Sequence, residues 1–386
     1  MTHEEYRSGI FDVAYLASCA VNGRIPDQER VSRMDLTVLY QTAARHLLTG
    51  ITAIALESAG IKDAAFTQAL GKAIRKAAVF DAEKEIVLDA LEKEGIWYLP
   101  LKGAVLKDYY PKMGMRQMAD IDILYDASRM ADVRIIMEGR GFTATKSYGR
   151  GIHDHYNKPP VLSFEMHRVL FSENRNERLA AYYRDVRNRM IPDDDSSYGC
   201  HLSKEDFYIH IIAHEYKHYS GGGTGLRSLL DTYVYILKEG DALDWPYITG
   251  ELEKLEIADF EAQNRSLAMH LFSGESLTAA DEEMLEYMLS SGTYGTAVNR
   301  VNNRLVRYGK GPFKRTRYVF SRIFLPMRVV RASFPKFAKY PVLLPFLPFY
   351  RIWQAATTRK SRARAELKAL AAGKTDKKTG TIQKND

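Results

Sequence analysis

The stretch GIWYLPLKGAVLKDYYPKMGMRQMADIDILYD, from Gly95 to Asp126, decides the fold of this chain. Its first apolar run, IWYLPL, is rich in strand-forming residues and bounded by glycines, which predicts a buried strand. Lys102 and Gly103 then form a turn before a short helical segment, AVLKDYY, and the turn-prone PKMGM. The run DIDILY, residues 120–125, predicts a second strand.

In this second strand, Asp120 and Asp122 are two residues apart, so their side chains leave the same face. Ile121 and Ile123 leave the other face, toward the core. Aspartate is depleted in strands, and two carboxylates on one face repel each other. A divalent cation removes that repulsion, and Mg²⁺ prefers such hard oxygen ligands. The pair therefore predicts a Mg²⁺ site.

A third carboxylate is expected on a neighbouring strand, and PVLSFEMHRVLF (residues 160–171) supplies it. Alternation along this predicted strand places Ser163, Glu165 and His167 on one face, with the apolar residues on the other. Three carboxylates around two ions roughly 3.5–4 Å apart suit in-line phosphoryl chemistry, with Glu165 as a metal ligand or as the base. Backbone amides of the Lys102-Gly103 turn are placed to cradle phosphate oxygens, and only glycine tolerates so close an approach.

Helical patterns surround this strand-rich segment. Residues 32–95 repeat apolar side chains at spacings of three and four, and helices are expected again from residue 204 to about 290. The sequence thus predicts an α+β fold, with a small mixed sheet embedded in helical regions. The expected parts are an N-terminal helical region (1–94), a catalytic core that carries the three carboxylates (95–200), a helical domain packing on it (201–300), a basic aromatic region (301–372) and a disordered tail (373–386).

Charge is distributed very unevenly. From residue 301 onward there are 21 Lys and Arg but 3 Asp and Glu, whereas the preceding residues hold 34 basic and 45 acidic side chains. The basic region interleaves its charges with aromatic residues, and prolines divide it into short pieces. Three interpretations stay open: helices folded back over the core, peripheral contact with an anionic membrane, or phosphate contacts to nucleic acid. The last is disfavoured because no nucleic-acid-binding motif accompanies the charge.

The cellular compartment is predicted from the cysteine content, the N-terminal residues and the lengths of the apolar stretches. Cys19 and Cys200 are the only cysteines, so no disulfide framework and no cysteine zinc site are expected. The N-terminal residues do not form a secretory signal, and no apolar stretch is long enough to span a bilayer. We therefore predict a cytoplasmic protein. If the basic region contacts a membrane, the protein would be peripheral to that membrane.

Together, these pieces resemble the DNA polymerase β-like nucleotidyltransferase superfamily, and more narrowly an uncharacterised bacterial nucleotidyltransferase family with an LKG turn. The matching segments are GIWYLPLKGAVL (95–106), MRQMADIDIL (115–124), FEMHRVL (164–170) and the helical run from HIIAHEYKH to ALDW (210–245). By this resemblance Asp120, Asp122 and Glu165 are the catalytic metal ligands. Lys102, Gly103 and Arg116 then bind the triphosphate, with a surface ion pair as the alternative for Arg116 and structural support of the turn as the alternative for Lys102. One departure is Ala104, which stands where the superfamily usually has Ser or Gly.

A competing motif is HEYKH, residues 214–218, a literal H-E-x-x-H zinc-peptidase signature. Catalytic zinc needs a third protein ligand, and His210 on the same helix lies too far along it to join both other histidines. The resemblance instead implies that His214 or His218 faces the nucleotide or the acceptor, with histidines packed at a domain interface as the alternative. Arg227 and Asp231, four residues apart, are expected to form a helix-surface ion pair.

The sequence therefore predicts a Mg²⁺-dependent enzyme that transfers a nucleoside monophosphate from an NTP such as ATP to a hydroxyl-bearing acceptor. Neither the base of the NTP nor the acceptor can be read from these residues. The alternative is a non-catalytic scaffold or membrane-associated protein that keeps the nucleotidyltransferase fold.

Overall fold

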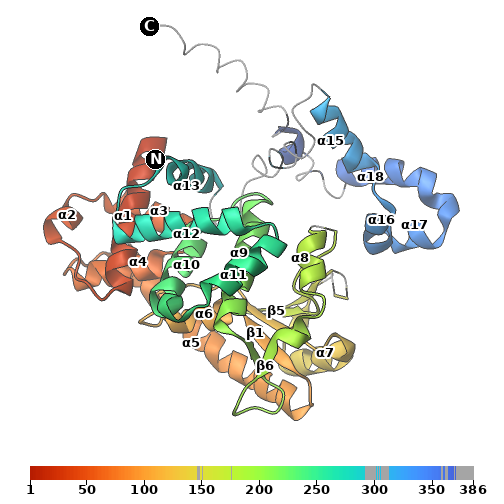
Figure 1. Ribbon diagram of the computed structural model, residues 1–386, viewed down its shortest axis with the longest axis horizontal. Helices are drawn as coiled ribbons and strands as arrows, with labels where there is room; N and C mark the ends of the chain where they lie inside the picture. Colours follow the sequence, from red (N-terminus) through yellow and green to blue (C-terminus); the bar gives the residue numbers. More distant parts are fainter. Residues whose placement is uncertain are drawn as a thin grey trace, which may run out of the picture. The chain divides into compact units, whose positions relative to one another are not determined.

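The computed structural model describes residues 1–145, 148–149, 151–174, 176–291 and 313–357, together with residues 301, 303, 305, 360, 364–368 and 370. The chain divides into two compact units, whose elements are labelled in Figure 1. The first unit comprises Met1–Glu215 and Leu226–Glu286, and the second comprises Tyr216–Gly225 and Tyr287–Asp386. The segment 373–386, predicted to be disordered, lies outside the described residues.

Helices precede the sheet because apolar residues recur at helical spacing and side chains cap the helix starts. Thr2 and Glu5 form a capping box at the first helix, and Asp27, Asp35 and Asp63 accept backbone N–H groups at the starts of three others. These helices are α1 (His3–Val21), α2 (Gln28–Ser32), α3 (Leu36–Arg45), α4 (Thr49–Ser58) and the 30-residue α5 (Ala64–Lys93).

The main sheet has five strands in the order β1-β2-β5-β4-β3. Only the β2–β5 pair is parallel; the others are antiparallel. The strands are β1 (Tyr98–Leu101), β2 (Ile121–Tyr125), β3 (Thr143–Ala144), β4 (His153–Lys158) and β5 (Leu162–His167). Between them lie α6 (Gly103–Leu106), η1 (Lys107–Tyr109), η2 (Ala127–Arg129) and α7 (Met130–Gly139).

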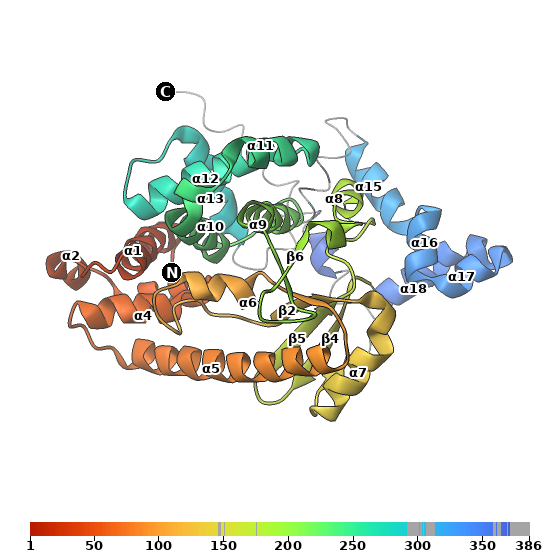
Figure 2. The same cartoon turned by 60° about the horizontal axis from the view of Figure 1, so that its bottom comes forward.

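The two faces of this sheet differ because side chains alternate along each strand. One face is apolar, and its buried strand residues pack against residues of α5 and α7: Tyr98, Ile121, Ile123, Tyr125, Tyr156, Phe164 and Met166 against Phe80, Val87, Leu91, Val133 and Met137. The intervening strand positions include charged and histidine side chains. Figure 2 shows α5 and α7 on one side of the strands and α9, α10 and α12 on the other.

The helices that follow the sheet complete the first unit. They are α8 (Glu177–Tyr182), η3 (Val186–Arg189), α9 (Lys204–Tyr219), α10 (Leu226–Glu239), η4 (Gly240–Ala242), α11 (Trp245–Lys254), α12 (Ala258–Ser273) and α13 (Ala279–Ser291), whose last residues enter the second unit. A two-stranded sheet, β6 (Met190–Pro192) and β7 (Cys200–Leu202), stands before α9.

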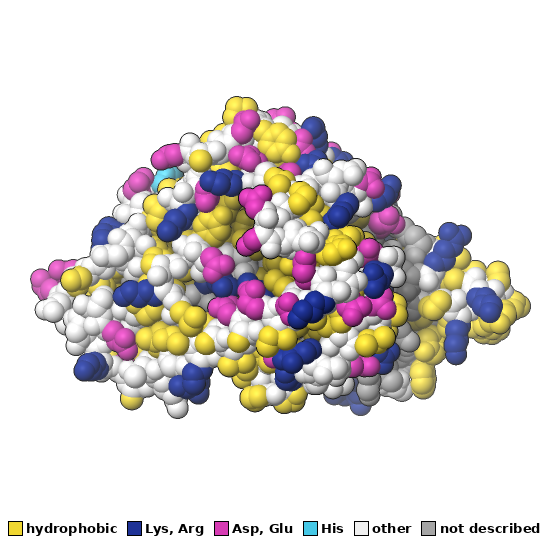
Figure 3. Space-filling model, turned by 90° about the horizontal axis from the view of Figure 1, so that it is seen from below, with side chains coloured by type: hydrophobic (Ala, Val, Ile, Leu, Met, Phe, Trp, Pro, Cys, Tyr) yellow, Lys and Arg dark blue, Asp and Glu magenta, His cyan; other side chains and the backbone are white. Residues whose placement is uncertain are grey.

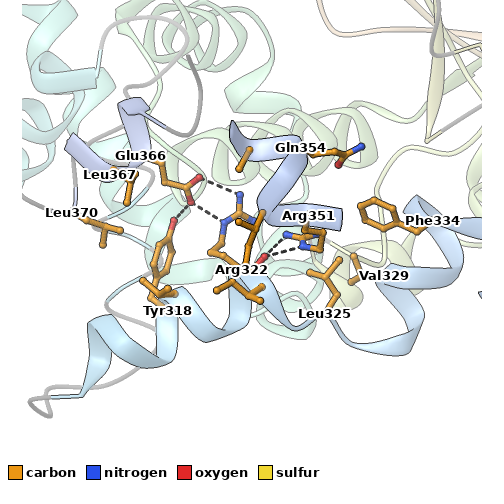
Figure 4. Close-up of a pocket in the computed structure, with 14 residues that line it drawn as sticks. Tyr318, Arg322, Leu325, Val329, Phe334, Arg351, Gln354, Glu366, Leu367 and Leu370 are labelled. Atoms are coloured by element: carbon orange, nitrogen blue, oxygen red, sulfur yellow. Dashed lines mark hydrogen bonds and ion pairs between the residues drawn. The ribbon is translucent and has the colours of Figure 1, made fainter. Parts of the chain in front are cut away.

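The second unit contains the basic aromatic region. Its elements are α15 (Lys314–Ile323), α16 (Met327–Ser333), α17 (Pro335–Lys339), η5 (Pro341–Phe346) and α18 (Leu347–Ala356). Residues of α15, α16 and α18 line a largely apolar cavity of about 460 Å³, in which Glu366 accepts hydrogen bonds from Tyr318 and from Arg322 (Figure 4). Among the described residues, no helix combines the length and apolarity that a bilayer crossing requires.

The predicted α+β class is confirmed. The predicted strands at 96–101, 120–125 and 160–171 appear as the shorter β1, β2 and β5. The sequence did not predict β4, although this strand proves important for the site.

Candidate active site

A row of polar side chains crosses the sheet at one level. Asp122 of β2 is the register partner of Glu165 of β5, and Glu165 is in turn the partner of His155 of β4. Two residues further along both strands, on the same face, His167 pairs with His153. Neighbouring strands lie about 4.8 Å apart, so these side chains share one face within contact distance.

Asp122 is the most enclosed acid of this row, with 6% of its surface exposed. Its Oδ1 accepts a hydrogen bond from Lys102 Nζ at 2.5 Å and lies 2.8 Å from Nε2 of His167. Burial opposes the charged form, but the Lys102 ammonium and the His167 ring hold the pKa of Asp122 well below its usual range. The carboxylate is therefore ionised at neutral pH and available as a cation ligand.

Glu165 lies among three imidazole rings. Its carboxylate oxygens are 3.5 Å from His153 Nδ1, 3.4 Å from His155 Nδ1 and 3.4 Å from His167 Nε2. Burial favours the neutral acid, yet the contacts with His167 and the other rings lower the pKa of Glu165. Burial also lowers the pKa of His153 to about 4, so its ring is neutral at pH 7. The surroundings of Glu165 thus offer nitrogen as well as oxygen ligands.

Asp120 precedes β2 and is half-buried. Burial, together with the charges of Asp122 and Glu165, raises its pKa to about 6 against the opposing effect of Lys102. The three predicted carboxylates are therefore close enough for the charge of one to shift the pKa of another. A bound cation would relieve this repulsion, so the residues present fit a divalent metal ion.

The turn after β1 has a strained backbone. Lys102 has φ 46° and ψ −116°, a region that non-glycine residues rarely occupy and that costs of order 1–3 kcal/mol. This conformation accompanies the contact between Lys102 Nζ and Asp122. A Cβ at Gly103 would lie 2.5 Å from Nη1 of Arg116, so glycine is required here by close approach of that guanidinium.

Arg116 is buried and belongs to an ion pair. Its Nε and Nη2 donate to the two carboxylate oxygens of Asp231 on α10, each at 2.8 Å, and Tyr110 donates to the same carboxylate at 2.7 Å. The prediction that Asp231 forms an ion pair on the helix surface with Arg227 is wrong, because Asp231 is buried and accepts hydrogen bonds from Arg116 and Tyr110. Arg116 thus links α10, through Asp231, to the turn at Gly103. Its role as a phosphate ligand stays a prediction.

Three helices fix the segment that leads into β2. The Oε1 of Gln117 accepts the N–H of Gly50 on α4, and its carbonyl accepts Arg227 of α10. Lys76 of α5 donates to the carbonyl of Ala119 at 3.4 Å. Such fixation holds the acid that follows in one position, as catalysis by preorganised charges requires.

The HEYKH motif lies in the helical layer. Glu215 is buried, and its Oε2 accepts from Thr232 Oγ1 at 3.3 Å and from Asn264 Nδ2 at 3.2 Å, which links α9 to α10 and α12. Burial raises the pKa of Glu215 to about 7. This interior position suits helix packing and not the water-activating glutamate of a peptidase. The ring centroid of His214 is 6.4 Å from that of His210, and its predicted contact with the nucleotide stays a prediction.

Sequence reasoning missed two residues of the site, His153 and His155. Both lie on the unpredicted β4, and the available signal was the alternation His-Asp-His-Tyr, which puts two imidazoles on one face and Tyr156 on the other. His167 was placed on the correct face but given no role.

The order of strand, glycine turn, helix and two neighbouring acidic strands is that of a nucleotidyltransferase. A model of the family described as uncharacterised nucleotidyltransferase matches residues 32–273, so the chain belongs to that family. No curated protein and no solved structure matches the chain. The resemblance inferred from the sequence is therefore confirmed at the level of the family, and the narrower LKG group and a bacterial origin stay predictions.

Proposed function

We propose that this protein transfers a nucleoside monophosphate from an NTP to a hydroxyl-bearing acceptor, with Mg²⁺ as cofactor and pyrophosphate as the second product. The observation that carries the proposal is the pairing of Asp122 and Glu165 as register partners on parallel strands, with Asp120 directly before the first. Family membership supports the reaction class. It leaves the base, the acceptor and the metal open.

In this proposal Asp120, Asp122 and Glu165 supply the metal-binding oxygens. Bound divalent ions neutralise phosphate charge and lower the pKa of a hydroxyl nucleophile. Lys102 places an ammonium group beside Asp122, where it contributes positive charge toward a phosphate. Arg116 acts through the turn as a positioning residue, because its guanidinium packs where a side chain of residue 103 would stand.

The chemical step is a single displacement at the α-phosphorus. A bond forms between the acceptor oxygen and phosphorus, the bond from phosphorus to the bridging oxygen of the β-phosphate breaks, and pyrophosphate leaves with that electron pair. The hydroxyl proton passes to Glu165, which is ionised because of its histidine contacts. The side chain of Glu165 is 15% exposed, so few water molecules reach this carboxylate.

The test is transfer of label from each α-labelled NTP, with Mg²⁺ and a bacterial lysate as the source of acceptors. Asp122→Asn should abolish transfer. Asp126→Asn is the matched control, because Asp126 caps the turn at the opposite end of β2 and asparagine caps equally well. Loss in both variants, or in neither, contradicts the assignment. Absence of transfer by the unmodified protein with every NTP favours the non-catalytic alternative.

We further propose that the second unit contacts an anionic membrane surface. Residues 301–365 contain no Asp or Glu, whereas Arg317, Arg331, Lys336 and Lys339 are exposed. Large apolar side chains are also exposed on the same elements: Phe320, Phe324, Tyr340, Val342, Phe346, Phe349, Ile352 and Trp353. Figure 3 shows this part of the surface, at the right, covered by hydrophobic and basic side chains. Aromatic side chains insert at the depth of lipid headgroups, and basic side chains are attracted to anionic headgroups, so this combination suits an anionic membrane surface.

Co-sedimentation with vesicles tests this contact. The protein should sediment with phosphatidylglycerol vesicles and stay in solution with phosphatidylcholine vesicles at the same salt concentration. The double variant Phe349→Ser with Trp353→Ser should reduce sedimentation at least tenfold, whereas Ile135→Ser, an equally exposed apolar residue of α7, should not. Equal binding to both vesicle types, or no effect of the double variant, overturns the proposal.

A further inference from the structure

Four side chains from β4 and β5 form a compact group on the polar face of the sheet. His153 and His155 come from β4, and Glu165 and His167 come from β5. One ligand atom each from His153, Glu165 and His167 can be chosen so that all three atoms lie within 4.8 Å of one another. This spacing is the one expected of ligands that converge on a single ion.

Two ring nitrogens of this group form no hydrogen bond, although Nδ1 of His153 lies 3.5 Å from the Glu165 carboxylate. The Nδ1 atoms of His153 and His167 are buried and have no hydrogen-bond partner among the described residues. His167 is 2% exposed, so water does not readily compensate for the missing bond. Buried polar atoms without partners are rare in folded proteins and call for an explanation such as a ligand or an ion.

Neighbouring side chains also orient both rings, and Nε2 of His167 lies between Asp122 and Glu165, 3.4 Å from the Glu165 carboxylate. Nε2 of His153 lies 2.9 Å from Nε2 of His155, and Nε2 of His167 lies 2.8 Å from Oδ1 of Asp122. Metal-binding histidines usually have such a partner on their second nitrogen, which fixes the ring orientation and the tautomer. In this arrangement His155 and Asp122 serve as positioning residues for the two rings.

We infer that His153, Glu165 and His167 bind a divalent first-row transition-metal ion of the Mn²⁺, Co²⁺ or Zn²⁺ class. Imidazole nitrogen suits these ions, whereas Mg²⁺ requires an octahedral shell of oxygen ligands. Two imidazoles and one carboxylate also leave coordination positions open for water or for a substrate oxygen. Binding of this ion does not require nucleotidyl transfer, so the inference stands apart from the proposed function.

The position of the group gives the inference a further consequence, which does rest on the proposed function. Because Glu165 is the register partner of Asp122, the transition-metal position adjoins the oxygen ligands of Asp120 and Asp122. The two ions of the centre would then differ, with Mg²⁺ on the aspartates and the transition metal on the histidine side.

The experiment titrates chelator-treated full-length protein with Co²⁺ alone. We expect one Co²⁺ per chain, a visible absorption band from nitrogen ligation, displacement of the band by Zn²⁺, and no displacement by millimolar Mg²⁺. His153→Ala should weaken Co²⁺ binding at least tenfold. His201→Ala, which removes an exposed histidine of β7 paired with Asp193, is the control and should leave binding unchanged.

Thermal unfolding of each variant separates lost ligation from lost folding, and His153→Gln provides a second substitution that keeps a polar side chain. Absence of the absorption band, competition by Mg²⁺, or equal losses in the His153 and His201 variants overturns the inference. Transfer of label with Mg²⁺ but no Co²⁺ binding would reject this inference and leave the proposed function intact. Co²⁺ binding without transfer under any condition would do the reverse.

Discussion

The two faces of the five-stranded sheet are built from the same strands and have opposite chemistry. Along β5, Phe164 and Met166 are fully buried against helices, whereas the intervening Glu165 contacts the following His167, which in turn contacts Asp122. Burial of each large apolar side chain contributes about 1.5–3 kcal/mol. The dry face thereby stabilises a strand register that brings carboxylates together on the other face despite their repulsion.

The largest effect is expected when the polar face loses its central acid. Asp122→Asn keeps the shape of the side chain and an acceptor for Lys102 but removes a charge. Transfer of label should fall by about a thousandfold, since metal-held charge contributes several kcal/mol to such reactions. The free energy of unfolding, measured in urea, should change much less. A large loss of stability would mean that this face also holds the sheet together.

The reciprocal change removes packing from the apolar face. Phe164→Ala leaves a cavity beside Phe142, whose ring centroid is 5.2 Å from that of Phe164, and should destabilise the protein by about 3–5 kcal/mol. Urea unfolding measures this loss. Ile135→Ala on the exposed surface of α7 is the control and should change stability by less than about 0.5 kcal/mol.

A third prediction concerns Glu215, a buried acid of α9 that lies outside the sheet and that we expect to affect stability and not catalysis. The pKa of Glu215 is about 7 in the folded protein against 4.5 in the reference state, so the folded state keeps a proton that the unfolded chain has lost. Stability from this group therefore falls as pH rises from 4.5 to 7, by roughly 3 kcal/mol.

Glu215→Gln should remove this dependence. The variant should exceed the original protein in stability at pH 8 and match it near pH 4, as measured by urea unfolding at both values. Glu253→Gln on the exposed side of α11 should leave the pH profile as it was. A loss of label transfer in Glu215→Gln would revive a catalytic role for the HEYKH segment.

The smallest expected effect concerns the turn beside the polar face. Gly103→Ala brings a methyl group to 2.5 Å from the guanidinium of Arg116, which cannot easily move because Asp231 holds it. We expect a loss of about 1–3 kcal/mol in stability and weaker nucleotide binding. Gly139→Ala in α7, where nothing lies within 4 Å, should instead stabilise by up to about 1 kcal/mol.

The same contrast explains how far the sequence could be read. β2 and β5 were predictable because their apolar residues alternate with acids and form a continuous apolar face. β4 was not, because HDHYNK has one large apolar residue and becomes a strand through pairing with β5. Its two histidines therefore stayed outside the predicted site.

Contacts between distant residues were also beyond the sequence pattern. Arg116 and Asp231 are 115 residues apart, and no spacing rule connects a loop before a strand with a residue on a later helix. The local pattern around Asp231 favoured the neighbour four residues away. The tertiary contact overrides that preference because a buried guanidinium needs a carboxylate with matching geometry.

The position of β5 in the sheet sets the order in which this protein can be assembled. β5 is the last of the five strands to be synthesised, yet it lies in the middle, between β2 and β4. A nascent chain that ends before Leu162 therefore has unpaired edges at β2 and β4 and lacks Glu165 and His167. Open edges promote association with other chains, so the ribosome-bound intermediate is the stage at which this protein most needs protection from aggregation.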